Sequence, residues 1–105
     1  MKRALIISGN LAQDHEFIYP YYRLLEAEFT VDVCLLEGKP VKGILGTALP
    51  PNKNQEVKNI DQVKVDDYNV LVLPGGVKAM EKVRQEKKII NFITKFNDQK
   101  KIIAC

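Results

Sequence analysis

The group in this sequence best suited to covalent chemistry is a thiol. Cys105 follows Ile102, Ile103 and Ala104, an apolar run that predicts a buried strand. A cysteine at the carboxyl end of a parallel strand stands where α/β enzymes often present a nucleophile, on a sharp strand-to-helix turn. The competing interpretation is a buried thiol that only fills space, the usual fate of a free cysteine. Position alone leaves both interpretations open.

A tight turn with exposed backbone donors is the second candidate feature. Pro74, Gly75 and Gly76 follow the unbroken apolar run of residues 70–73, which predicts a central parallel strand buried on both faces. Proline and glycine then end the strand. Such a turn exposes N–H groups at the sheet edge where open α/β sheets bind ligands. Without the thiol at the same edge, a simple tight loop would be the preferred interpretation.

A carboxyl group is the third candidate. Glu16 follows the loop after the first predicted strand, residues 4–7, so we expect it at the same sheet edge as Gly75 and Cys105. A carboxyl beside a thiol in a partly closed site could be protonated and donate a hydrogen bond to the thiolate. An ordinary carboxylate at the positive end of a helix is the alternative.

The remaining residues with metal-binding or redox potential predict no second site. Cys34 alternates with apolar neighbours inside a predicted strand, which indicates core packing. His15 is the single histidine, and without partners it indicates a surface or capping residue. One histidine and two distant cysteines have no metal-ligand spacing, so we expect no metal. The loop after residue 7 matches no nucleotide-binding motif, and no other cofactor is expected.

Length and composition favour one small globular domain. The sequence has 105 residues, 46% of them hydrophobic, and a net charge of +3 that is spread along the chain. No basic block with interleaved aromatics indicates a nucleic-acid surface, and no apolar run is long enough for a membrane span. No signal peptide is recognised at the start, so a cytoplasmic location with free thiols is expected.

The order of predicted elements is typical of a doubly wound sheet. Strands are expected at residues 4–7, 30–36, 70–73 and 101–105, and helices from about residue 14, at 77–84 and at 86–97. A short hairpin is expected at 41–49, with an irregular connection up to residue 63. We therefore predict an open, mostly parallel, flavodoxin-like α/β sheet. The last strand lacks a covering helix, so residues 1–105 are expected to form the N-terminal part of a larger domain.

The first predicted helix has recognisable start and face residues. Asp14 is expected to cap it, and Glu16 suits its positive end. Pro20 requires a bend unless it lies in the first turn. A single buried face is predicted from the helical spacing of Phe17, Tyr21, Leu24 and Leu25.

Four stretches resemble the ThiJ/PfpI superfamily, and within it the PfpI-type intracellular proteases, whose fold is related to class I glutamine amidotransferases. The stretches are 14–24, 68–76, 81–84 and 101–105. The resemblance implies that Cys105 is the nucleophile and that Glu16 hydrogen-bonds it. It also implies that Gly76, with Gly75 beside it, supplies the oxyanion donor. Glu81 matches, less closely, an acid that reaches a neighbouring subunit's site, so a homo-oligomer is implied.

The resemblance departs from the family pattern after the nucleophile. A histidine, a glycine and a helix are expected there, but the sequence stops at Cys105. The function implied for the intact protein is a cysteine-dependent hydrolase acting on a peptide, an amide or a small glycated or aldehyde-derived adduct, the last being the glyoxalase-like or deglycase-like variant. The alternative is a stress sensor without turnover, in which Cys105 is oxidised to a sulfinate held by Glu16.

Overall fold

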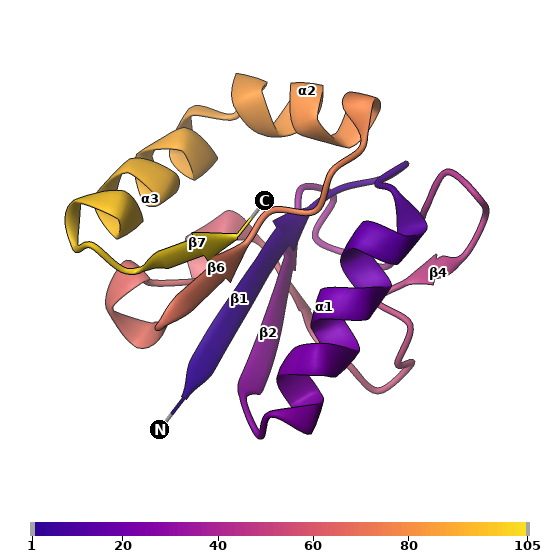
Figure 1. The fold of residues 1–105 in the computed structure, drawn as a ribbon. Coiled ribbons are helices and arrows are strands. Elements are labelled where there is room, and N and C mark those ends of the chain that lie inside the picture. The colour runs from indigo at the N-terminus through magenta and orange to yellow at the C-terminus, as the bar shows by residue number, and fades with distance from the viewer. Residues whose placement is uncertain (1, 105) are drawn as a thin grey trace.

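The centre of the molecule is a five-stranded parallel sheet, seen in a computed structural model that describes residues 2–104 except the side chains of Val77, Lys78 and Met80. Its strands lie in the order β5-β2-β1-β6-β7, and every neighbouring pair is parallel (Figure 1). The strand bounds are β1 (Arg3–Ser8), β2 (Thr30–Leu35), β5 (Val57–Lys58), β6 (Val70–Val72) and β7 (Ile102–Ala104). The predicted mostly parallel α/β sheet is therefore confirmed, while the strand end predicted at Cys105 lies outside the described residues.

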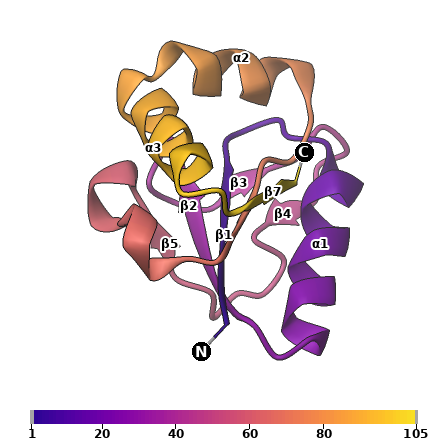
Figure 2. The same cartoon turned by 60° about the vertical axis from the view of Figure 1, so that its left-hand side comes forward.

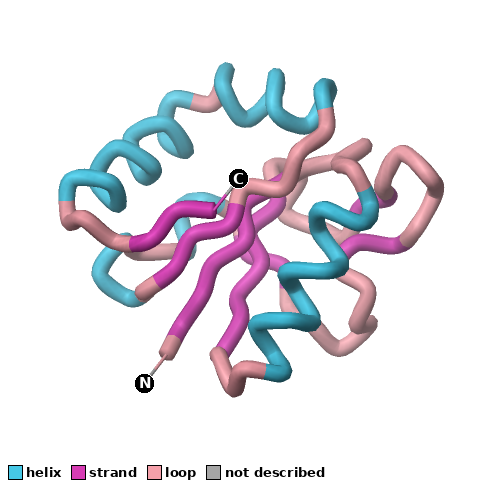
Figure 3. Tube along the Cα trace, in the orientation of Figure 1, coloured by secondary structure: helices cyan, strands magenta, loops and turns pink. Residues whose placement is uncertain are grey.

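Helices cover both faces of the sheet. Helix α1 (Asp14–Glu26) lies on one face, and α2 (Val77–Gln85) with α3 (Lys87–Asp98) lies on the other (Figures 1 and 2). Two short 3-10 helices, η1 (Ile60–Gln62) and η2 (Val65–Asp67), precede β6 (Figure 3). Of the helices in the described part of the chain, none is long and apolar enough to cross a membrane.

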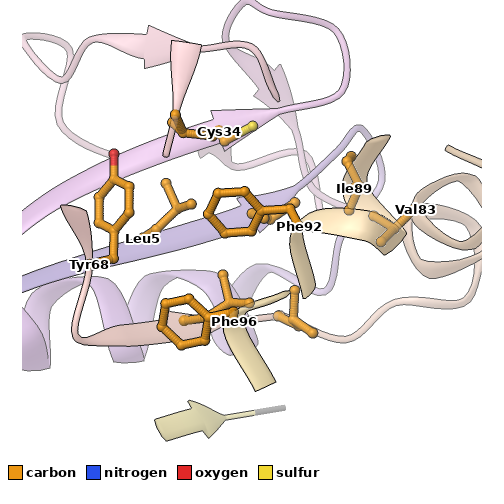
Figure 4. Packing of buried hydrophobic residues seen from close by; sticks show 11 residues of the cluster. Leu5, Cys34, Tyr68, Val83, Ile89, Phe92 and Phe96 are labelled. Atoms are coloured by element: carbon orange, nitrogen blue, oxygen red, sulfur yellow. The ribbon is translucent and has the colours of Figure 1, made fainter. Parts of the chain in front are cut away.

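The two sheet faces have separate cores because strand residues alternate between them. On the α2–α3 side, Leu5 and Leu71 pack with Phe92 and Phe96 (Figure 4). On the α1 side, Val72 belongs to a second cluster, which contains Phe17 and Tyr21. Burial of each such side chain contributes about 2 kcal/mol. Strand β6 is thus buried on both faces, as its unbroken apolar sequence predicted.

The segment between β2 and β6 contains the predicted hairpin and one strand that was not predicted. Strands β3 (Val41–Lys42) and β4 (Ala48–Leu49) pair antiparallel. The expected irregular connection nevertheless includes β5, which pairs with β2 through Val33 and Cys34. Its two residues are too few for a period-two pattern to be recognised.

Helix α1 corrects two predictions about its residues. Its N-cap is Gln13, whose side chain accepts the backbone N–H of His15, and not Asp14. Leu25 is 38% exposed, although Phe17 and Tyr21 are fully buried. The buried stripe ends at the partly buried Leu24, and Leu25 is rotated beyond the edge of that stripe.

A polar cluster lies toward the amino end of the sheet. The Asp32 carboxylate accepts the Tyr68 hydroxyl at 2.7 Å and the Arg3 guanidinium at 2.9 Å, with Lys58 Nζ at 3.5 Å. Burial opposes ionisation of Asp32, but the Tyr68 hydroxyl and the charges of Lys58 and Arg3 outweigh it, so its pKa is lowered. The ionised carboxylate therefore stabilises this end of the fold.

Candidate functional site

The carboxyl ends of β1 and β6 lie at the topological switch point of the sheet, where later strands are added on the opposite side of β1. From β1 the chain passes through α1 to β2 on one side, and β6 later adds to the other side of β1. Open α/β sheets bind ligands at such a switch point, in the crevice outside the carboxyl ends of the strands. The loop before α1 and the turn after β6 meet there (Figure 3).

Direct backbone contacts join this loop and this turn. The N–H of Gln13 donates to the carbonyl of Gly75 at 2.9 Å. Gly76 has a φ of +128°, and a methyl group on its Cα would lie 2.8 Å from the nitrogen of Gln13. A residue with a side chain would be strained there by its backbone angle and by this approach. Glycine at position 76 therefore permits the two segments to touch.

Glu16 and Gly75 are brought together at the same edge. A methyl group on Gly75 would lie 2.6 Å from both carboxyl oxygens of Glu16, which is closer than a real Cβ contact. Glu16 stands in the first turn of α1, and its side chain is exposed. An acid group thus lies against the backbone of the turn while it remains accessible to a ligand.

A hollow of about 330 Å³ adjoins this acid. It is lined by residues from α1, from β6 and its turn, and from β7, namely His15, Glu16, Tyr19, Pro20, Val72, Pro74 and Ala104. The N–H of Leu73 donates to the carbonyl of Ala104 at 2.8 Å, so the end of β7 is held beside β6. Cys105 itself lies outside the described residues, but Ala104, the residue before it, shares the hollow with Glu16.

The turn has backbone donors that can serve a ligand. Within residues 2–104, neither the N–H of Gly75 nor that of Gly76 donates to a backbone carbonyl. Gly76 is also the N-cap of α2, where the helix dipole favours negative charge. These donors are suited to an oxygen that gains negative charge.

The other candidate residues take different positions. Cys34 is fully buried, and burial raises its pKa to about 12, so its predicted packing role is confirmed. His15 is exposed beside Glu16. Glu81 is exposed on α2 and does not line the hollow. No group of three or more His, Cys, Asp or Glu in the described part of the chain could hold a metal ion.

One residue of this region, Asp14, has a different role from the helix cap that the sequence predicted. The Asp14 carboxylate is 1% exposed and accepts the backbone N–H groups of Leu45 at 2.8 Å and Thr47 at 3.0 Å. The hydrogen bond from Leu45 lowers the pKa of Asp14. Burial opposes this effect, and the bond from Thr47 adds to it. The sequence signal for this contact is the spacing of Gly43 and Gly46 in the hairpin. It indicates a tight loop, whose backbone N–H groups require a hydrogen-bond acceptor.

The chain is similar in sequence to several known proteins. The model of the DJ-1/PfpI family matches residues 2–105. The deglycase PfpI of Pyrococcus furiosus is 32% identical over 102 residues, covering 97% of this chain and 58% of that protein. A deglycase of Pyrococcus abyssi is 33% identical over 106 residues, with the same two coverages.

Solved structures show the same fold. The VC2308 protein superposes with a TM-score of 0.85 at 23% identity, covering 97% of this chain and 50% of that one. DJ-1beta of Drosophila melanogaster superposes with a TM-score of 0.83 at 26% identity, covering 97% and 53%. The chain thus spans 58% of the length of the curated relatives described above.

Proposed function

The chain belongs to the DJ-1/PfpI family, and on this basis we propose that the whole protein is a cysteine-dependent hydrolase of the deglycase type. Cys105 is its nucleophile, Glu16 is the acid that holds the thiolate, and the backbone of Gly75 and Gly76 binds the oxyanion. The protein needs no metal or organic cofactor for this chemistry.

The contact between Glu16 and Gly75 is the observation that carries this proposal. It places an accessible carboxyl group against a turn whose N–H groups make no backbone hydrogen bond among the described residues. The same hollow reaches Ala104, and Cys105 is the next residue of the chain. Its thiol therefore needs to extend by only one residue from Ala104 to meet the carboxyl group and the turn. Nucleophile, acid and oxyanion donor then converge on one small volume.

The reaction follows from these three groups. The Cys105 thiolate adds to the carbinol carbon of the adduct as the amine leaves, so a C–S bond forms, the C–N bond breaks and the amine takes up a proton. A proton then passes from this carbon to the neighbouring carbonyl carbon through an enediolate, whose negatively charged oxygen the N–H groups of the turn stabilise by about 3 kcal/mol per donor, and a hydroxyacyl thioester results. Water then cleaves the thioester, supplying oxygen to the acid product and restoring the thiol.

Two observations favour a small aldehyde-derived adduct over a peptide. The relatives from P. furiosus and P. abyssi are named as deglycases. The hollow of about 330 Å³ is near the lower limit of small-molecule sites, and an extended peptide would need a longer groove.

Turnover assays on the whole protein test this proposal. The substrate is an adduct of a dicarbonyl compound with N-acetyllysine, and the readout is release of the free amine, beside a peptide amide as the rival substrate. Cys105→Ser should abolish release, whereas Cys34→Ser, the matched thiol control, should retain it. Cleavage of the peptide alone would replace the deglycase with a protease. No turnover of either, with oxidation of Cys105 to a sulfinate, would favour the stress sensor.

A further inference from the structure

Asp14 makes a connection that the proposed chemistry does not use. Its buried carboxylate holds the loop 43–47 through the N–H groups of Leu45 and Thr47, more than thirty residues away in sequence. We infer that Asp14 is a positioning residue: by tying this loop to the first turn of α1, it fixes Glu16 and the loop that contacts the Pro74-Gly75-Gly76 turn. This inference rests on the proposed function.

The loop is shaped around this carboxylate. The N–H of Gly43 donates to the carbonyl of Thr47 at 2.9 Å, and that of Gly46 to the carbonyl of Gly43 at 3.0 Å. These bonds close a tight turn that directs two further N–H groups at Asp14. A methyl group on Gly43 would overlap the Asp14 carboxyl group, so the loop backbone and the acid are in direct contact.

The same hairpin is bound to the segment that precedes α1. The N–H of Leu11 donates to the carbonyl of Lys42 at 2.8 Å, and the N–H of Ile44 donates to the carbonyl of Ala12 at 3.0 Å. The N–H of Lys42 donates to the side chain of Asn10. Residues 10–14 are thus bonded to the hairpin on one side.

On its other side this segment touches the proposed oxyanion turn. Gln13 donates to the carbonyl of Gly75, and Ala12 and Gln13 leave no room for a side chain at Gly76. Segment 10–14 therefore lies between the hairpin and the turn. A shift of the hairpin can therefore reach the turn through the Asp14 side chain and through the backbone bonds on both sides of this segment.

The side chains of Asp14 and Glu16, both in the first turn of α1, contact different segments. Residues i and i+2 of an α-helix are about 200° apart around the axis, so their side chains leave nearly opposite sides of the helix. Asp14 goes to the hairpin and Glu16 to Gly75. Loss of the Asp14 acceptor leaves two N–H groups without their partner, which favours a rearrangement of the loop. The helix start then loses the restraint that opposes movement of Glu16.

The experiment compares Asp14→Asn and Asp14→Glu with Asp32→Asn in the whole protein. Asp32 is a matched control because it too is a hydrogen-bonded carboxylate with little exposure, but it lies toward the amino end of the sheet. The first readout is amide hydrogen exchange of Gln13, Leu45 and Thr47. The second is the pH midpoint of the Cys105 thiolate absorbance, with Glu16→Gln as the reference.

Asp14→Asn should accelerate amide exchange of Gln13 as well as of Leu45 and Thr47, by about fivefold to tenfold. The thiolate midpoint should move by more than half of the shift that Glu16→Gln produces. Asp14→Glu keeps the charge and should give smaller changes of the same sign. Asp32→Asn, compared at equal global stability, should leave both readouts near those of the wild type.

Two other results have distinct meanings. Faster exchange at Leu45 and Thr47 alone, with Gln13 and the thiolate unchanged, would overturn the inference and leave Asp14 as a local loop anchor. Faster exchange at Gln13 in a protein whose thiolate is indifferent to Glu16→Gln would support the positioning role of Asp14, while contradicting the role of Glu16 in the proposed function.

Discussion

The carboxyl group of Glu16 occupies the space that a side chain at Gly75 would need. The two residues are far apart in sequence, and they meet because α1 begins, and β6 ends, at the same edge of the sheet. Glycine at position 75 therefore has a purpose besides turn formation. It lets an acid group rest on the backbone of the turn that is proposed to bind the oxyanion.

Gly75→Ala should affect reactivity more than stability. The added methyl group meets the end of a flexible side chain, so Glu16 should swing away at a stability cost of about 1 kcal/mol or less. The rate at which iodoacetamide modifies Cys105 should change, because the acid proposed to hold the thiolate is displaced. Gly38→Ala is the control: Gly38 has a φ of +68°, and a methyl group there would make only an ordinary contact with Asn59 at 3.8 Å, so alanine should lower stability through backbone strain without changing that rate.

The two cysteines should differ sharply in reactivity. Burial raises the pKa of Cys34 to about 12, so its thiolate is scarce at neutral pH and its sulfur is inaccessible. Mass spectrometry after brief treatment of the folded whole protein with iodoacetamide should find label on Cys105. The denatured protein, as control, should be labelled on both. Label mainly on Cys34 of the folded protein would refute the assignment of the nucleophile.

The strands and helices could be predicted because their determinants are local. The apolar run of residues 70–73 predicted a strand buried on both faces, and β6 packs Leu71 on one face and Val72 on the other. Phe17 and Tyr21 likewise predicted the buried stripe of α1. Each of these patterns depends only on neighbouring residues and on the periodicity of the element.

The missed features depend on tertiary contacts. Asp14 was expected as a helix cap, since that rule considers only residues near the helix start. Its real partners, Leu45 and Thr47, belong to a hairpin whose docking no local pattern reports. Strand β5 was missed for the same reason, because its strand character comes from pairing with β2. The order of elements placed Glu16 and Gly75 at one edge but could not reveal their contact.

Asp32→Asn should reduce stability in a pH-dependent way. Loss of the charge weakens the bonds from Tyr68 and Arg3, at about 1–3 kcal/mol near neutral pH. The folded state lowers the pKa of Asp32, so its contribution is present above the unfolded value of about 3.9 and is lost as pH falls through the folded value. Urea unfolding at pH 7 and below pH 4 should show the difference between the two proteins shrinking in acid. A constant difference would contradict the ionised assignment.

Self-association is expected of the whole protein. Glu81 is exposed on α2 and outside the hollow, and the hypothesis that it completes the site of a neighbouring chain requires the chains to associate. Light scattering at micromolar concentration should give a mass above that of one chain. Glu81→Gln should lower turnover while the mass is retained, and Glu86→Gln, a charge-matched change at the end of the same helix, should not. A mass equal to that of one chain would contradict this prediction.

The Cys105 thiolate titration, followed by absorbance in the whole protein and in three Glu16 variants, tests the central claim most directly. Two adjacent groups that exchange a proton titrate as a pair, so replacement of one moves the other. Glu16→Gln keeps a donor of similar shape and should retain more thiolate at neutral pH than Glu16→Ala. Glu16→Asp, shorter by one methylene, should give a further distinct curve. Four superimposable curves would show that Glu16 is an ordinary carboxylate at a helix start, uncoupled from the thiol.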